Sequence, residues 1–182
     1  MARSFVLLLL TVTFMAQASG QGGTHDPAFE KINLEQWLAE RHQARFHLVG
    51  WVARAELAFH QRLMSRVEIE LDGRDWATRR GDGKLTIFIQ ITDHDGMRYQ
   101  NHGSIELSQL GDDIKTTILD YSQRAFFLPG DYRLAIAILD TATGEHSTRQ
   151  MPFGVDPPQH ELLTDAWSDL PPVEFISPRE IA

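Results

Sequence analysis

Acidic residues at a turn supply the first candidate for chemistry in this chain of 182 residues. Asp93 and Asp95 lie one residue apart in the stretch DHDG. Calcium loops use carboxylates at this spacing, but the further oxygen ligands and the distal glutamate of an EF-hand are missing here. The asparagine, aspartate and glycine preferences of turns explain the stretch without a ligand. We therefore interpret it as a hairpin turn, and a calcium site stays open only if Asp112 and Asp113 approach it in space.

Histidine and serine patterns give no catalytic or metal-binding set. The eight histidines stand at positions 25, 42, 47, 60, 94, 102, 146 and 160. None has the spacing of a helical zinc site. Ser147 follows His146, but no nucleophile elbow is present to activate it. Among 25 acidic residues some close pair is expected by number alone, so glycoside hydrolysis is not indicated. We expect no enzymatic activity, no metal and no cofactor.

Tryptophan supplies the best candidate for binding, because an exposed indole stacks on sugar rings or anchors a protein interface. Trp76 follows a predicted strand, in a loop between Arg74 and Arg79. We expect this loop to expose its ring, and we take these three residues as the candidate binding face. Trp51 lies on an apolar strand and Trp167 in the C-terminal tail. We expect Trp51 in the core and Trp167 docked across the domain.

The first residues have the order of a secretory signal peptide. Arg3 gives a positive start, Phe5 to Ala16 form an apolar run too short to span a bilayer, and small residues follow. We expect cleavage after Ala18, or alternatively after Gly20, and a secreted or periplasmic protein. The mature chain is expected not to insert in a membrane.

Composition limits the partners of the exported chain. The sequence contains no cysteine, which excludes both disulfides and lipid attachment through cysteine. Arg3 is the only charged residue before the first cleavage site, so processing changes the net charge from −8 to −9. This acidity argues against nucleic acid and against anionic membrane surfaces. A protein or a polysaccharide remains as the partner class.

Five segments follow from the pattern of apolar residues. Asn33 and Gln36 have the spacing of a capping box and start a short helix. The segments are a signal peptide (1–18), a flexible lead-in (19–32), the helix (33–45), a β-sandwich domain (46–156) and a Pro-containing tail or linker (157–182).

Alternating apolar and polar residues predict seven strands in this domain. They cover residues 46–57, 64–72, 84–92, 97–107, 118–128, 132–140 and 145–155. Gly96 and Gly144 are expected at positive φ in hairpin turns. Gly103 interrupts a polar strand, which indicates an edge strand with a bulge that could accept a partner strand. Ala135 and Ala137 leave one face of their strand thin, and we expect that strand to be central.

The turn before this central strand decides the fold class. Pro129 and Gly130 have the order of a type II turn, in which glycine supplies the positive φ. Tyr132 then lies where Ig-type sandwiches have a tyrosine whose hydroxyl bonds back to the backbone, the tyrosine corner. The sequence therefore predicts an all-β, seven-stranded antiparallel Ig/fibronectin-III-like β-sandwich with a short N-terminal helix. A barrel or an α+β sheet is the alternative architecture.

Three stretches also carry a resemblance to known proteins: LSQLGDDI, DYSQRAFFLPGDYRLAIAILDTATGEHS and DPPQHELLTDAWSDLPPVEF. They resemble the N-terminal Ig-like region of secreted bacterial proteins, often acidobacterial, that are grouped with von Willebrand A domains. The resemblance spans Trp51 to Phe175 and implies no catalytic residue. The D-x-S-x-S metal motif of a von Willebrand A domain is missing from this sequence. The resemblance thus implies a short or truncated member.

These patterns favour an exported, non-enzymatic module with a protein-interaction or structural role at the bacterial cell envelope. A carbohydrate-binding module is the first alternative, and it requires exposed aromatic rings on a flat face. An accessory domain of a hydrolase is the second.

Overall fold

The computed structural model describes residues 23–40, 45–58, 61–77, 79, 83–109, 112–158, 167 and 169–176. The predicted signal peptide and both cleavage sites lie outside these residues. Within the described part, no helix combines the length and the apolar character needed to cross a membrane.

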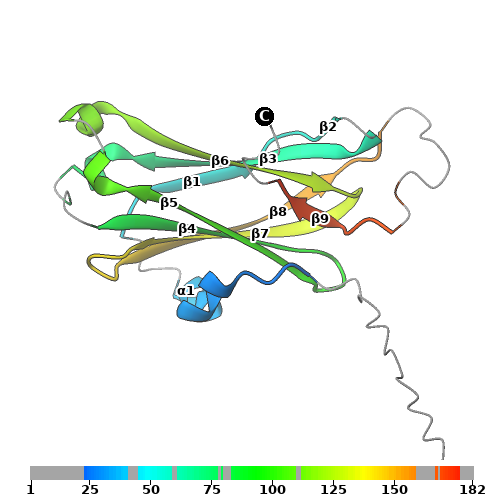
Figure 1. Cartoon of the computed structure of the whole chain (residues 1–182), viewed down its shortest axis with the longest axis horizontal. Coiled ribbons are helices and arrows are strands. Elements are labelled where there is room, and N and C mark those ends of the chain that lie inside the picture. Colours follow the sequence, from blue (N-terminus) through cyan, green and yellow to red (C-terminus); the bar gives the residue numbers. More distant parts are fainter. Residues whose placement is uncertain are drawn as a thin grey trace, which may run out of the picture.

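Two antiparallel sheets pack face to face (Figure 1). Sheet A has the order β1-β3-β6-β9, with β2 also paired to β3, and sheet B has the order β5-β4-β7-β8. The strands of sheet A are β1 (Leu48–Val52), β2 (Glu56–Leu57), β3 (Leu63–Asp72), β6 (Ile118–Phe127) and β9 (Val173–Phe175). Those of sheet B are β4 (Lys84–Thr92), β5 (Arg98–Glu106), β7 (Gly130–Asp140) and β8 (His146–Val155).

Short helices complete the described structure. The helix α1 covers Leu34–Ala39, and Asn33 caps it by accepting from the backbone N–H of Gln36 at 3.1 Å. The 3-10 turns are η1 (Pro27–Lys31), η3 (Gly73–Asp75), η4 (Leu107–Gln109) and η5 (Asp112–Thr116).

The predicted all-β antiparallel sandwich with a short N-terminal helix is confirmed, although the described residues form nine strands rather than seven. The predicted strand 46–57 is divided into β1 and the two-residue β2, and the three-residue β9 lies in the segment predicted to be a tail. Segments this short carry too few residues for an alternating pattern. The Ig/fibronectin-III-like assignment stays a prediction. The strand order supports it, because the four strands of sheet B are arranged as the C′, C, F and G strands of such domains.

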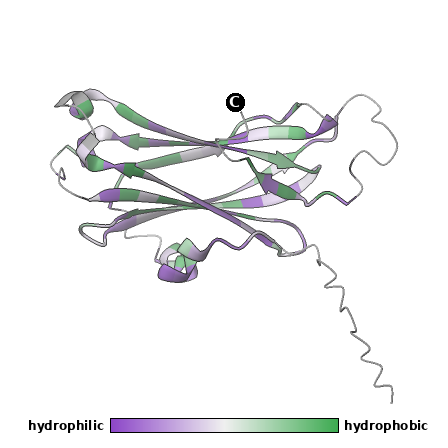
Figure 2. Cartoon of the chain, viewed as in Figure 1, coloured by the Kyte–Doolittle hydropathy of each residue, from purple (hydrophilic) through white to green (hydrophobic). Residues whose placement is uncertain are grey.

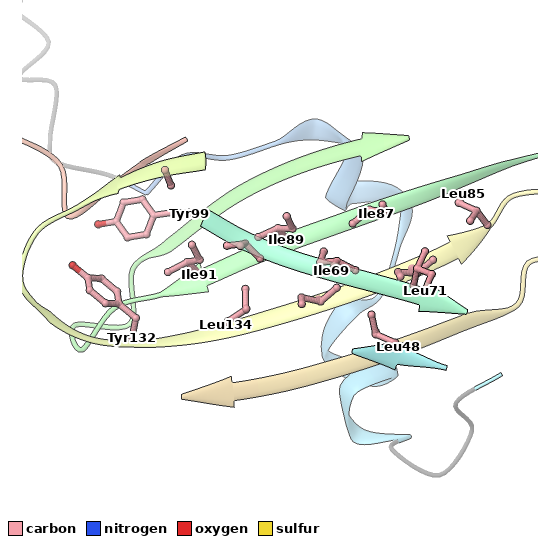
Figure 3. Packing of buried hydrophobic residues seen from close by; sticks show 14 of the residues in the cluster. Leu48, Ile69, Leu71, Leu85, Ile87, Ile89, Ile91, Tyr99, Tyr132 and Leu134 are labelled. Atoms are coloured by element: carbon pink, nitrogen blue, oxygen red, sulfur yellow. The ribbon is translucent and has the colours of Figure 1, made fainter. Parts of the chain in front are cut away.

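The core forms where the inward-facing side chains of the two sheets meet (Figure 3). On β3 the odd-numbered residues are buried, whereas the even-numbered ones are partly or fully exposed. This alternation is visible as changing hydropathy along the strands in Figure 2. The inward residues of β4 and β7 are buried completely: Leu85, Ile87, Ile89, Ile91, Leu134, Ile136 and Ile138. Burial of each such side chain contributes ~1.5–3 kcal/mol, which allows the sandwich to fold without a disulfide.

The outer face of sheet B is covered by the N-terminal segment. In Figure 1, α1 lies on the side of sheet B that faces away from sheet A, and α1 contacts β8. Phe29 packs edge-on against Phe88, with ring centroids 5.2 Å apart. Ala135 and Ala137 are buried in the same cluster, so the small outward side chains of β7 leave space for the N-terminal segment to pack on sheet B. The expectation that β7 is central is confirmed, since it pairs with both β4 and β8.

The corner between β6 and β7 is held by a buried tyrosine. The hydroxyl of Tyr132 donates to the carbonyl oxygen of Leu128 at 2.8 Å and lies 3.2 Å from that of Pro172. The first bond is the one that the tyrosine-corner interpretation predicts. The second ties the segment before β9 to the same corner.

The predicted type II turn at this corner is wrong in detail. Gly130 has a φ of +159°, nearly extended, and is the first residue of β7. A type II turn requires a φ near +80° at this position. The chain therefore bends at Pro129, and the carbonyl of Leu128 accepts its hydrogen bond from the hydroxyl of Tyr132. The two hairpin glycines behave as predicted, with φ of +82° at Gly96 and +75° at Gly144.

Gly103 serves a different purpose from the predicted bulge. The register between β4 and β5 continues unbroken from Lys84 opposite Glu106 to Thr92 opposite Arg98. A Cβ atom at Gly103 would lie 2.3 Å from the hydroxyl oxygen of Tyr121 on β6. A side chain at this position would therefore have to displace the Tyr121 ring, which reaches across from the other sheet. The prediction that this strand lies at a sheet edge is confirmed.

We expect Tyr132→Phe to lower the free energy of unfolding by about 1 kcal/mol at neutral pH, because the corner loses a hydrogen-bond donor. Burial raises the pKa of Tyr132 to about 12, so its stabilisation is present below its ordinary pKa of 10.0 and lost as the pH rises toward 12. The difference between wild type and variant should therefore shrink over this pH range in urea titrations. Tyr121→Phe is the control, because the Tyr121 hydroxyl has no hydrogen-bond partner within the described residues. Equal losses in both variants would contradict the corner assignment.

Candidate functional site

The expected exposure of Trp76 is wrong, because its side chain is completely buried. The turn η3 precedes it, and the Trp76 N–H donates to the carbonyl of Gly73 at 3.1 Å. This turn directs the ring back into the end of the sandwich, where it lies 4.3 Å from the ring of Phe46. The indole nitrogen finds no hydrogen-bond partner within the described part of the chain. Trp76 is therefore a core residue.

Arg74 and Arg79, the other two predicted members of that face, lie in different environments. Arg74 is exposed and pairs with the carboxylate of Asp72 at 2.5 Å. Hydrogen bonds from Arg74 lower the pKa of Asp72 to about 2. Arg79 is partly buried, stacks over Phe46 at 4.8 Å and forms ion pairs with acidic residues of the β7–β8 hairpin. The predicted trio therefore does not form one binding face.

The carboxylate of Asp93 is used by its own hairpin. Its Oδ1 accepts from the backbone N–H of Asp95 at 3.0 Å and from that of Met97 at 2.9 Å. Its Oδ2 accepts from the hydroxyl of Tyr99 at 3.0 Å, and the pKa of Tyr99 is raised by burial and by this carboxylate. Within the described residues, no three His, Asp or Glu side chains converge as metal ligands. The stretch thus has the hairpin geometry that the turn interpretation predicts.

Histidines fasten the N-terminal segment to sheet B. His102 on β5 lies 2.5 Å from the carboxylate of Asp26, and that carboxylate also accepts from the backbone N–H of Ala28. His146 on β8 stacks on Trp37 of α1, with ring centroids 4.0 Å apart. Both pairs join the segment before β1 to an edge strand of sheet B. Their geometry accounts for these histidines without a metal.

Ser147 is also structural. Its hydroxyl oxygen accepts from the backbone N–H groups of Arg45 and Phe46 at 2.9 and 2.8 Å. The residue is almost completely buried. It therefore holds the segment that enters β1 and has no access to a substrate.

The edge strand β5 is partly occupied by the chain itself. The backbone N–H of Gln100 donates to the carbonyl of Thr24 at 2.9 Å, and the side chain of Gln100 accepts from the N–H of Asp26. A hollow of about 630 Å³ lies between this edge and β9. Its lining includes His102, Tyr121 and Glu174. No described residue there is arranged as a nucleophile with its base.

The outer face of sheet A differs from that of sheet B, because no described helix covers it (Figure 1). The exposure of Trp51 overturns its expected place in the core, since 39% of the residue is accessible. Its Cα partner on β3 is Glu68, and that of Glu68 on β6 is Ser122. We call the outward residues of this region the sheet A face, and it consists of Trp51, Arg66, Glu68, Glu70, Asp120, Ser122 and Arg124.

Charges on the sheet A face are arranged in rows across the strands. Glu70 lies directly opposite Asp120, and we call this pair the acidic row. Arg66 lies directly opposite Arg124, and we call this pair the arginine row. Between them runs the middle row, which consists of Trp51, Glu68 and Ser122.

Like charges directly opposite each other destabilise a sheet. Sheet B shows the ordinary arrangement, because Lys84 lies opposite Glu106. Within the described residues, Glu70, Asp120 and Arg124 have no ion-pair partner on their side chains, whereas Arg66 pairs with Glu68 at 3.3 Å. The two like-charge rows are therefore an arrangement that stability of the isolated domain does not explain. Violations of a local rule of this kind are expected at functional sites.

A shallow hollow extends the sheet A face beyond the acidic row. It has a volume of about 430 Å³, and Val49, Glu70 and Ile118 contribute to its lining. Ile118 is 59% exposed. The uncovered face thus combines exposed apolar groups with charges.

No protein-family model matches the chain, and no curated protein matches it. Among solved structures, the Northeast Structural Genomics Consortium target SoR45 shares 15% identity with a TM-score of 0.37, over 65% of this chain and 92% of that one. A glycosyl hydrolase family 2 member from Bacteroides cellulosilyticus shares 14% identity with a TM-score of 0.42, over 61% of this chain and 15% of that one. Likenesses at these TM-scores say nothing about what this chain binds.

We expect Asp120→Arg to raise the free energy of unfolding by about 0.5–1 kcal/mol, because it replaces a like-charge pair with an opposite-charge pair beside Glu70. The urea midpoint at low ionic strength measures this gain, and added salt should reduce it. Asp131→Arg is the matched control, since this exposed aspartate on β7 lies opposite Gly154. Loss of stability in Asp120→Arg with an unchanged control would show that Asp120 and Glu70 do not repel each other.

Proposed function

We propose that the chain is an exported, non-enzymatic interaction module of the bacterial cell envelope, and that it binds through the sheet A face. The observation that carries this proposal is the pair of like-charge rows beside the exposed ring of Trp51. A partner that supplies opposite charges would remove the repulsion within each row. Binding would thereby be favoured at the residues whose like charges repel each other in the isolated domain.

The distribution of polar groups supports a binding role over an enzymatic one. Asp93, Ser147 and His102 each bond within the domain in ways that maintain the fold. The charges of the acidic row, by contrast, are free of ion-pair partners among the described residues and face outward. The residues that contribute most to binding at protein interfaces are enriched in tryptophan and arginine, and the sheet A face has both.

The carbohydrate-binding alternative now depends on Trp51 instead of Trp76. A flat sugar-binding face generally requires several rings, and Trp51 is the one large exposed aromatic side chain within the described residues. Binding of purified polysaccharide would therefore depend on this single ring. The hydrolase-accessory alternative gains no support from a likeness that covers 15% of the hydrolase.

We expect Trp51→Ala to reduce binding to an envelope component by about ten-fold or more, because it removes the exposed aromatic ring of the sheet A face. The measurement compares immobilised wild type and variant for capture from soluble envelope extract of the producing bacterium. Leu57→Ala is the control, since Leu57 is 49% exposed on β2 but lies outside the sheet A face. Unchanged capture by Trp51→Ala would refute the proposed face, and retention by purified polysaccharide alone would favour the carbohydrate-binding alternative.

A further inference from the structure

The sheet A face is complementary to itself. Along β3 the order is Glu70, Glu68, Arg66, and along β6 it is Asp120, Ser122, Arg124. Outward residues of a strand repeat every two positions, or about 7 Å. The acidic row and the arginine row therefore lie at equal distances on opposite sides of the middle row.

From this arrangement we propose that two copies of the chain associate through their sheet A faces, about a two-fold axis that lies in the interface and follows the middle row. The proposal rests on the proposed function, because it names the partner of the same face. Isologous contacts of this kind, in which one patch meets its own copy, are the commonest form of oligomer.

The two-fold operation determines which side chains meet. It reverses the direction along the strands and leaves the position across the strands unchanged. Asp120 of one copy then faces Arg124 of the other, and Glu70 faces Arg66. Each pair occurs twice, so both like-charge rows meet rows of opposite charge.

The middle row lies on the axis, so each of its residues meets its own counterpart. The Trp51 rings of the two copies approach each other there, and ring pairs are favourable in offset or edge-on geometry. The Glu68 carboxylate also meets its counterpart, but its charge is compensated by Arg66 of the same chain at 3.3 Å. Ser122 is small and uncharged and permits close approach.

A partner of uniform charge would fit this face less well than a second copy. A basic protein would neutralise the acidic row but would be repelled by Arg66 and Arg124, and an acidic one would have the reverse problem. A second copy satisfies both rows with one contact. The self-complementary order of charges is therefore the observation that selects a second copy as the occupant.

The expected association is weak and depends on salt. A patch of three strands by three rows covers on the order of 300 Å² at the spacings of a sheet, well below the ~800 Å² per partner of a standard interface. Exposed ion pairs are also screened by salt. The dimer should therefore form at high protein concentration and low ionic strength.

The charge pair of β6 gives the sharpest test. Asp120→Arg places arginine against Arg124 of the second copy, and Arg124→Glu places glutamate against Asp120. We expect each single variant to raise the dissociation constant about ten-fold or more in sedimentation equilibrium at low salt. The double variant restores opposite charges and should return the constant to within about three-fold of wild type.

Unfolding does not explain such a loss, because both single changes also place opposite charges across β3 and β6 within one chain. A wild type that stays monomeric to its solubility limit at low salt would overturn the proposal. So would a double variant that associates no better than the singles.

Cross-linking tests the position of the axis separately. The chain has no cysteine, so Ser122→Cys introduces a single thiol on the axis. A short bismaleimide should join two copies of this variant much faster than two copies of Ser104→Cys, a control whose thiol lies on β5, at the edge of sheet B. Equal cross-linking rates would overturn the proposed axis.

The outcomes separate this proposal from the proposed function. A monomeric wild type whose capture of an envelope component still depends on Trp51 would overturn self-association alone. Self-association that passes the charge test, without capture of any envelope component, would make the second copy the partner. Failure of both would refute the sheet A face as a binding site.

Discussion

Side chains alternate between the two faces of every strand, and the rest of this structure depends on that constraint. The inward rows of sheets A and B must fill one shared core, so residues such as Ile69, Ile89 and Ile136 are buried completely or almost completely. Each sheet also has an outward face whose side chains do not contribute to the core. The two outward faces differ in whether another part of the chain covers them, and the candidate binding site lies on the uncovered one. On sheet B the outward side chains of Ala135 and Ala137 are small, and the N-terminal segment covers this face.

The charged residues of the sheet A face are arranged in an order that packing of the core does not require. The core and the tyrosine corner fix the register of β3 and β6, since Leu63 lies opposite Phe127 next to the Leu128 carbonyl. A slip by two residues would place Arg124 opposite Glu68, a better electrostatic pair. Cross-strand pairs contribute ~0.2–1 kcal/mol, whereas each buried core side chain contributes ~1.5–3 kcal/mol. The core therefore decides the register, and the outer face accepts its like-charge pairs.

The sequence predicted those parts of the fold in which one face of a strand is clearly apolar. The alternation from Leu85 to Ile91 identified β4, and the residues before Tyr132 identified the corner. Trp51 was misplaced because both faces of β1 are apolar in sequence, with Leu48 and Val52 on one and Val49 and Trp51 on the other. Trp76 was misplaced because a loop position does not reveal which way a side chain turns; the η3 turn decides this. Neither error concerned the strands themselves.

The charge rows could not be found from the sequence, because they exist only once the register is known. Glu70 and Asp120 are fifty positions apart in the chain, and nothing in either strand alone indicates that they meet. The same register that sets these acids side by side also sets Arg66 beside Arg124, one step beyond the middle row. Repulsion within the domain and complementarity between two domains are therefore consequences of one pairing of strands. A face selected only for the stability of a single copy would have mixed the charges within each row, as sheet B does at Lys84 and Glu106.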